Sequence, residues 1–298
     1  MNDGDLFQPL LIRPFSSLEE YEACAAFQEE VWGEGFSEKV SGAILMIANR
    51  IGGLSAGAFD QEGRLQGFVF GLTGVEDGRL VHWSDMLAVR NHLRDQGLGT
   101  RLKEYQREVL LGRGVGRMYW TFDPLQSRNA YVNFCKLGIT SREYVRDMYG
   151  ETGSPLHGGL GTDRLVATWE MASTRVEGRM SGEDLPPARE DWVDLPVALG
   201  GEKGGEFPVP GTPVLVLDEP SIRLSIPRRM DALMEYDPAL ALRWREATRE
   251  ALLHYLKSGY QVTELVPDGD LSHYLLETAS LSEESSWKKE EEREGTTA

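Results

Sequence analysis

Cysteine is scarce in this chain of 298 residues, which has only 2 cysteines. Cys24 and Cys135 are also far apart in the sequence. Two thiols are too few for a disulfide framework or a zinc site, so the sequence excludes both kinds of small stabilised scaffold. We therefore expect a protein of the reducing cytosol that holds no metal.

Long apolar runs and positive charge are scarce as well. No run reaches the roughly 18 apolar residues of a membrane-spanning helix, so no membrane partner is expected. The first residues, Met1–Asp5, are acidic and unlike a signal peptide. Lys and Arg total 31 against 48 Asp and Glu, a net charge of −17, which argues against a nucleic-acid partner. The length allows one large or two ordinary domains.

The most informative stretch runs from His82 to Leu102, where an apolar strand leads through a loop into a helix. The junction has the pattern Arg94-x-x-Gly97-x-Gly99. Glycines allow a tight turn, and the first N–H groups of a helix favour a phosphate. The pattern predicts a cradle for a nucleotide-like cofactor. A helix start with glycines placed for packing is the alternative, and the three-glycine dinucleotide motif is incomplete.

This stretch resembles motif A of the GNAT family, the acyl-CoA-dependent N-acyltransferases. In that family a strand ending Leu-Ala-Val precedes Arg/Gln-x-x-Gly-x-Gly/Ala, and Leu87-Ala88-Val89 precedes the glycine motif here. Four further segments resemble a branch of predicted acyltransferases, some of which accompany amino-acid racemases of the enolase superfamily; they are residues 122–125, 129–130, 136–138 and 161–164.

The periodicity predicts a mixed α/β sheet flanked by helices. The expected elements are a strand at 11–14, a helix from the N-cap Ser17 to Gly33, a shorter helix within 36–50, strands at 54–59, 65–72 and 80–89, a helix at 100–111, a strand at 118–122, a helix from Ser127 or Asn129 to Leu137, and a strand at 164–171. This is the element order of the GNAT fold, so the resemblance covers roughly residues 10–171.

Four parts follow from this assignment. Residues 1–171 form the acyl-CoA-binding catalytic domain, 172–212 an irregular linker, 213–281 a C-terminal α/β region, and 282–298 a disordered charged tail. Strands at 214–217, 222–226, 260–266 and 273–276 surround a helix at 239–256. This order echoes the back half of a GNAT unit and predicts a degenerate half-repeat. An extension without repeat origin is the alternative, and no second cofactor site is expected.

The resemblance implies where coenzyme A binds. It lies where two adjacent parallel strands part, and the backbone of the first strand pairs with the pantetheine amides. The co-substrate implied is acetyl-CoA or another acyl-CoA such as succinyl-CoA. The implied cofactor-binding residues are Leu87, Ala88 and Val89 for pantetheine, Arg94, Asp95, Gln96, Gly97, Leu98, Gly99 and Thr100 for the diphosphate, and Asn129, which also contacts pantetheine.

The family base lies four or six residues before the Val, at Asp85 or Trp83 here. Asp85 is our first choice, because burial beside Trp83 would raise the pKa of its carboxyl. An equally open alternative is that Asp85 orients an arginine or the substrate amine. Strand alternation places Trp83, Asp85, Leu87 and Val89 on one side and His82, Ser84 and Met86 on the other. His82 is therefore expected to be a buried structural histidine.

The proton donor departs from the family pattern. The usual tyrosine, four residues before the helix-ending glycine, is replaced by Phe134. Tyr131, one turn earlier, is a substitute acid or a packing residue. No His or Asn pattern supports Cys135 as a nucleophile, so direct attack without a covalent intermediate is expected.

The acceptor site is implied between the last helix and the last strand. Arginine suits carboxylates, so an amino acid or a dicarboxylic acyl donor is expected. The implied substrate-binding residues are Trp83, Arg142, Arg146, His157 and Arg164. The sequence thus predicts a transferase that moves an acetyl or succinyl group to the amine of a small molecule. A non-catalytic acyl-CoA-binding module and a protein or peptide N-acetyltransferase are the alternatives, and a homodimer is left open.

Overall fold

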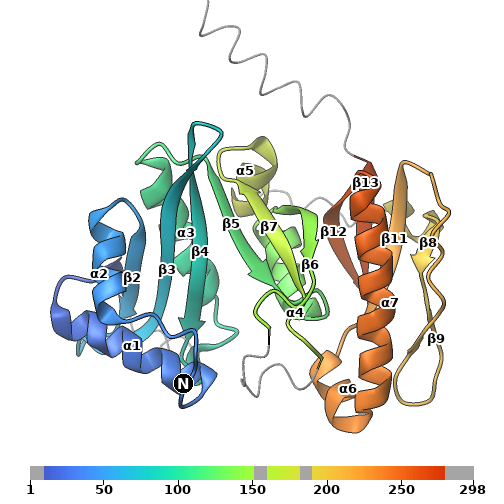
Figure 1. The fold of residues 1–298 in the computed structure, drawn as a ribbon, viewed down its shortest axis with the longest axis horizontal. Helices are drawn as coiled ribbons and strands as arrows, with labels where there is room; N and C mark the ends of the chain where they lie inside the picture. Colours follow the sequence, from blue (N-terminus) through green and yellow to red (C-terminus); the bar gives the residue numbers. More distant parts are fainter. Residues whose placement is uncertain (1–9, 151–159, 182–189, 279–298) are drawn as a thin grey trace, which may run out of the picture. The chain divides into compact units, whose positions relative to one another are not determined.

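The computed structural model describes residues 10–150, 160–181 and 190–278 (Figure 1). The chain forms two compact units that interleave along the sequence. The first unit comprises Met1–Asp123, Lys136–Ile139 and Val145–Asp184, and the second comprises Pro124–Cys135, Thr140–Tyr144 and Leu185–Ala298. Within the described ranges, no helix combines the length and apolar character needed to cross a membrane.

The first unit contains a mixed sheet in the strand order β1-β2-β3-β4-β5-β7. Every neighbouring pair in it is antiparallel except β4 and β5, which are parallel. The strands are β1 (Leu11–Pro14), β2 (Leu54–Phe59), β3 (Leu65–Glu76), β4 (Arg79–Val89), β5 (Arg117–Phe122) and β7 (Arg164–Glu170).

Helices cover both faces of this sheet. On one face α1 (Leu18–Trp32) and α2 (Gly42–Arg50) enclose a core that includes Phe68 and Met86. On the other face α3 (Leu98–Leu111) packs on a second core around Val69. Neighbouring strand residues such as Phe68 and Val69 point to opposite faces, which separates the two cores. A further helix, α5 (Thr174–Ser181), follows β7. The predicted α/β class is confirmed.

A β-bulge interrupts the pairing of β3 with β4. Phe70 pairs with Met86 but Gly71 pairs with Ser84, which leaves Asp85 as the extra residue on β4. A bulged residue has no partner of its own and bends the strand that carries it. The bulge therefore falls on the residue that the sequence analysis selected as the candidate base.

The bulge also changes which side chains share a face. Before it, Ser84 bonds to side chains of α3. After it, Leu87 and Val89 pack against the α3 core, whereas Met86 and Ala88 belong to the α1–α2 core. The prediction that Leu87 and Val89 share a side with Trp83 was therefore wrong, because one extra residue shifts the alternation by one position.

Buried polar side chains link α3 to the strands beside the bulge. Lys103 Nζ donates to Ser84 Oγ at 2.7 Å and to Gln106 Oε1 at 3.3 Å, and lies 4.0 Å from the centroid of the Trp120 ring. Ser84 Oγ donates to Gln106 Oε1 at 3.0 Å. Burial lowers the pKa of Lys103 to about 7, because a charge there is removed from water.

The network continues from Gln106 to His82, a histidine with 0% of its surface exposed. Gln106 Nε2 lies 3.0 Å from His82 Nε2, and His82 Nδ1 lies 3.0 Å from Thr73 Oγ1. The Thr73 hydroxyl donates to Gly52 O, so Nδ1 carries the proton of the imidazole and Nε2 accepts. Burial, and then the charge of Lys103, lower the pKa of His82 to about 3. The expected structural role of His82 fits this burial.

The second unit has a sheet in the order β6-β12-β13-β11-β8. Its strands are β6 (Thr140–Val145), β8 (Val197–Leu199), β11 (Ser221–Pro227), β12 (Tyr260–Asp268) and β13 (Leu271–Thr278). Its helices are α4 (Ser127–Tyr131), which runs on into a π-helical turn at Val132–Lys136, then α6 (Met230–Tyr236) and α7 (Pro238–Lys257). Short elements complete the described chain: 3₁₀ turns at Asn91–Leu93 and Glu190–Asp194, and the pair β9 (Gly201–Glu202) and β10 (Val209–Pro210).

Each unit contains a strand with one parallel and one antiparallel neighbour. In the first, β5 lies between parallel β4 and antiparallel β7. In the second, β11 lies between parallel β8 and antiparallel β13. The half-repeat origin of the C-terminal region remains a prediction that this topology favours.

Several elements differ from the sequence expectations. The sequence analysis missed β6, α5 and α6, and α5 and β8 lie in the segment expected to be irregular. The expected strand at 214–217 forms no ladder, because the Val214 carbonyl accepts from the Tyr255 hydroxyl and the Leu217 N–H donates to that hydroxyl oxygen. The expected tail at 282–298 and most of the first ten residues lie outside the described residues.

The lowered pKa of Lys103 predicts a pH-dependent stability. Between pH 7 and the ordinary value of 10.5, the unfolded chain binds a proton that the folded chain does not. The free energy of unfolding should therefore rise with pH in that window, by up to about 1.4 kcal/mol per pH unit from this group. Lys103→Met should remove this slope in urea titrations from pH 7 to 10. The exposed Lys39 provides the control, since Lys39→Met should leave the slope unchanged. Equal slopes in the three proteins would contradict the assignment.

Candidate functional site

The parallel pairing of β4 and β5 is short. Only Val81, His82 and Trp83 pair with β5, where their partners are Arg117, Met118 and Tyr119. Both strands continue past this ladder, β4 to Val89 and β5 to Phe122. The two strands therefore part after Trp83 and Tyr119, and among the described residues none forms a ladder with that side of β4 from Asp85 onward.

The predicted turn and helix follow β4, so that β4, the turn and α3 form the predicted strand–turn–helix. Two residues of the turn have a left-handed backbone, Asp95 with φ 66° and Gly97 with φ 82°. The first hydrogen bond of α3 runs from Arg101 N–H to Gly97 O at 3.0 Å. The preceding N–H groups, those of residues 98–100, are beyond the reach of any carbonyl of the helix. Such groups at a helix N-terminus attract an anion.

The two glycines of the motif have different surroundings. A Cβ built on Gly97 would meet no protein atom within 4 Å, so open space lies beside this left-handed residue. A Cβ on Gly99 would lie 3.7 Å from Leu87 Cδ2, which is an ordinary contact. Packing therefore requires a glycine at neither position. Backbone conformation requires one at 97, and the space beside it can admit a ligand.

Charged groups gather near the bulge. The Asp85 side chain is exposed, yet the surrounding protein withdraws its carboxyl from bulk water enough to raise its pKa. Glu38, between α1 and α2, also has a raised pKa, first through burial and then through the charge of Asp85, while Arg164 acts in the opposite direction. Glu38 was missed by the sequence analysis, because no motif marks the loop that carries it.

The structure distributes the predicted site residues between the two units. Trp83, Asp85, residues 87–89 and residues 94–100 lie on one strand–turn–helix of the first unit. The Trp83 ring is half-buried, with its centroid 6.4 Å from that of Tyr119. Arg146 and Arg164 also belong to this unit.

Those two arginines have different environments. Arg146 is exposed and pairs with Asp147 at 3.2 Å, so a surface ion pair accounts for it. Arg164 donates from Nη1 to Asp163 O at 3.0 Å, and its guanidinium carbon lies 5.3 Å from the centroid of the Tyr149 ring. His157 lies outside the described residues.

The other predicted residues belong to the second unit. Arg142 Nε donates to Gln261 Oε1 at 2.9 Å, and Asn129 Oδ1 accepts from Asn133 Nδ2 at 3.3 Å. Tyr131 is half-buried on α4. In the same unit Phe134, four residues before Gly138, is fully buried with its ring 5.7 Å from that of Tyr274.

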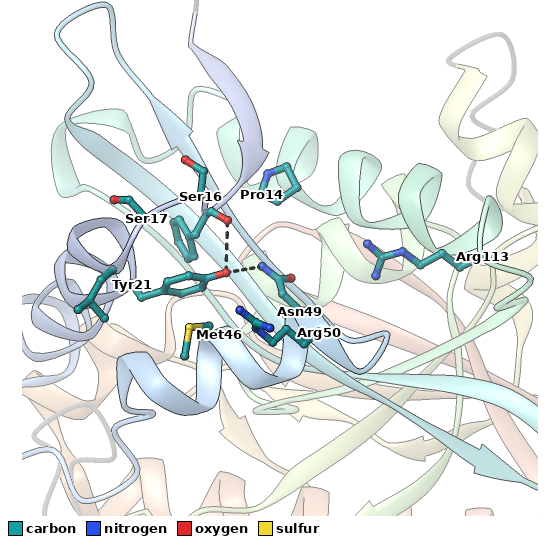
Figure 2. A pocket seen from close by; sticks show the side chains of 10 residues that line it. Pro14, Ser16, Ser17, Tyr21, Met46, Asn49, Arg50 and Arg113 are labelled. Atoms are coloured by element: carbon teal, nitrogen blue, oxygen red, sulfur yellow. Dashed lines mark hydrogen bonds between the residues drawn. The ribbon is translucent and has the colours of Figure 1, made fainter.

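A separate pocket of about 370 Å³ lies where α1 begins and α2 ends (Figure 2). The Tyr21 hydroxyl donates to Phe15 O at 3.3 Å and accepts from Asn49 Nδ2 at 3.1 Å, as the dashed lines show. Arg50 and Arg113 also line it, but no carboxylate, histidine or cysteine does. None of the predicted site residues lines this pocket, and its hydrogen bonds join α1 to α2.

Comparison with known proteins gives a likeness at the level of structure only. No protein-family profile matches the chain, and no curated protein matches it. Among solved structures, a chain of the NatC complex bound to Gag peptide and CoA is 13% identical, with 54% of this chain and 98% of that one covered at a TM-score of 0.43.

Two bacterial structures are similar to a comparable extent. An acetyltransferase of the GNAT family from Streptococcus pneumoniae is 17% identical, with 54% of this chain and 98% of that one covered at a TM-score of 0.42. The protein yncA from Salmonella typhimurium, solved with its cofactor acetyl-CoA, is 14% identical, with 54% and 94% covered at a TM-score of 0.42. A likeness this distant carries no statement about activity, which must be argued from the site itself.

Substituting each of the two glycines by alanine tests whether the turn binds CoA. Gly97→Ala should lower CoA affinity at least about tenfold, because a Cβ would enter the open space and disturb the left-handed turn, at a stability cost of about 1 kcal/mol. Gly99→Ala should keep CoA affinity and hold or raise the melting temperature, since alanine favours a helix. Calorimetric titration with CoA and thermal unfolding measure both effects. Equal CoA affinity in the two variants would show that the turn does not bind CoA.

Proposed function

We propose that this chain is an acyl-CoA-dependent N-acyltransferase that transfers an acetyl or succinyl group from coenzyme A to the amine of a small molecule, an amino acid in the first instance. The parting of β4 and β5 is the observation that carries the proposal. It leaves one strand edge unpaired directly before a helix N-terminus whose turn is open to a ligand. Coenzyme A is an extended molecule with amides towards one end and a diphosphate towards the other. Its amides suit the unpaired strand edge, and its diphosphate suits the helix N-terminus.

In this proposal the backbone of Leu87–Val89 pairs with the pantetheine amides. The N–H groups from Asp95 to Thr100 bind the diphosphate, with Arg94 supplying positive charge. The thioester then lies near the end of the β4–β5 ladder, where the side chain of Asp85 is found. Such binding supplies most of what the reaction needs, because a held thioester and amine react far faster than free ones.

Asp85 is the proposed proton acceptor. An amine attacks only when it is neutral, and the proton of its ammonium form must be accepted by some group. The raised pKa of Asp85 brings its carboxylate closer to the basicity that this role requires. The other role considered for Asp85, orientation of the amine by charge, would use the same position. The attack is direct, with no acyl-enzyme intermediate.

Charge near the bulge supports an amino acid as acceptor. Asp85 and Glu38 are carboxylates and Arg164 is cationic, and both Asp85 and Arg164 act electrostatically on Glu38. An amino acid carries an ammonium and a carboxylate, which are complementary to this mixture. A peptide N-terminus presents only the ammonium close to the reacting atom.

One observation favours the non-catalytic alternative. Phe134 stands where the family carries its tyrosine, so the usual proton donor is absent from that slot. A module that binds acyl-CoA without transferring the acyl group would need no donor. Measurements of CoA binding and of turnover therefore have to be made separately.

The proposal is tested with acetyl-CoA and succinyl-CoA against D- and L-amino acids and a panel of short peptides. Thiol release reports turnover, and calorimetry reports CoA binding. Turnover with amino acids supports the proposal, and turnover with peptides alone corrects the acceptor. Binding without turnover favours the module. If the protein shows no CoA binding and no turnover, the assignment to acyl-CoA chemistry is overturned.

Asp85→Asn should lower kcat/KM by about 10²–10⁴-fold and leave the affinity for CoA unchanged, because a proton acceptor is lost but no CoA contact is. The wild-type rate should increase as pH rises through the raised pKa of Asp85, since only the carboxylate accepts a proton. The variant should lack this rise. Asp77→Asn, an identical change on the exposed β3–β4 turn, serves as the control. An unchanged pH profile in Asp85→Asn would exclude Asp85 as the base.

A further inference from the structure

A phenol lies on the β5 side of the gap between β4 and β5. The Tyr149 hydroxyl is 2.9 Å from Thr121 Oγ1, and Tyr149 comes from the segment between β6 and β7. The ladder between β4 and β5 ends at the pair Trp83 and Tyr119. Asp85 is two residues beyond Trp83, and Thr121 is two residues beyond Tyr119. Counted along each strand from that pair, Thr121 and Asp85 are therefore both the second residue past the ladder.

Thr121 shares a face of the sheet with Trp83. Trp83 pairs with Tyr119, and Tyr119 and Thr121 are alternate residues of β5. The intervening Trp120 points the other way, to Lys103 of α3. The hydroxyl of Tyr149 therefore lies on the sheet face away from α3, beside the second residue of β5 past the ladder.

The backbone that carries Tyr149 is firmly held. The Tyr149 N–H donates to Thr162 Oγ1 at 3.1 Å, and the Thr162 hydroxyl donates to Gly150 O at 3.2 Å. The Asp147 N–H donates to Asp163 Oδ1 at 3.0 Å. Thr162 and Asp163 are 1% and 0% exposed, so water does not compete for these bonds. Thr162 and Asp163, in the segment at 161–164, therefore stabilise the turn at 147–150.

We propose that Tyr149 is the proton donor to the thiolate that departs from coenzyme A. This inference rests on the proposed function. The amine lone pair forms the new C–N bond, the C–S bond breaks with its electron pair on sulfur, and the phenol proton passes to that sulfur. Asp85 takes the proton that the amine gives up, and the phenolate recovers a proton from water.

Neighbours of Tyr149 suit a phenol that gives up its proton. Either oxygen of the Thr121–Tyr149 pair can be the donor, so Thr121 can turn its hydroxyl toward the phenolate that the transfer leaves. The Arg164 guanidinium, 5.3 Å from the ring centroid, places a positive charge beside it.

The other phenol on this face is engaged elsewhere. The Tyr119 hydroxyl donates to Glu76 Oε2 at 2.6 Å and accepts from Arg117 Nη1 at 3.2 Å. Glu76 lies at the β3–β4 turn, and Arg117 is at the start of β5, away from the parted ends of the strands. Of these two phenols, it is Tyr149 whose hydroxyl bonds to β5 past the end of the ladder.

Tyr149→Phe in the full chain tests the inference, with acetyl-CoA and the best acceptor amine from the panel above. We expect kcat to fall by about 10²-fold, with the CoA dissociation constant and the melting temperature unchanged, because only the donated proton is lost. The oxygen-ester analogue of acetyl-CoA, in which oxygen replaces the sulfur, provides a second readout. An alkoxide is more basic than a thiolate and depends more on a donated proton, so the variant should lose more activity with the oxygen ester than with acetyl-CoA.

Tyr131→Phe is the matched comparison, since Tyr131 is the rival donor and the change removes the same hydroxyl. Unchanged turnover in Tyr149→Phe would overturn the inference, as would a large loss in Tyr131→Phe alone. An equal loss with acetyl-CoA and its oxygen ester would also overturn it, because it would mean that Tyr149 only maintains the site. If the wild type binds CoA but turns over no acyl-CoA with any amine, the proposed function itself fails, and this inference fails with it.

Discussion

The first unit depends on the short parallel contact between β4 and β5. Three residue pairs join the strands, and past them each strand follows its other neighbour, β3 or β7. The bulge at Asp85 promotes this divergence, because an extra residue bends β4 and increases its twist. An unsatisfied strand edge inside a sheet is unfavourable unless something pairs with it. The parted strands are therefore a position where a ligand with amides would be stabilised.

Polar side chains form a linked network between α3 and the strands β3 and β4. Lys103, Ser84, Gln106, His82 and Thr73 form a continuous chain of hydrogen bonds between α3 and β3–β4. A buried lysine is unfavourable in itself, and its bonds and the Trp120 ring offset only part of that. A hydrogen-bond network of this kind is satisfied by only one arrangement of its donors and acceptors. It fixes the position of the helix N-terminus relative to the strand before it.

The sequence was sufficient for the first unit's main elements and for the glycine turn, since both depend on local periodicity and backbone conformation. It was insufficient for features that arise from pairing. The Asp85 bulge depends on the register with β3, and so the faces of Leu87 and Val89 could not be read from alternation. Glu38, Thr121 and Tyr149 became candidates only through tertiary contacts. The apolar segment at 214–217 was predicted as a strand but forms no ladder, because the Tyr255 hydroxyl bonds to its backbone.

The interleaving of the two units has a consequence for how the protein can be made and divided. The chain leaves the first unit after Asp123, re-enters it at Lys136 and again at Val145, and leaves it finally after Asp184. During synthesis, β5 emerges well before β7, its antiparallel neighbour, and stretches destined for the other unit emerge between them. Neither unit is a continuous length of polypeptide, so no single cut in the gene yields one of them intact. Both units must therefore be expressed together, as parts of one polypeptide.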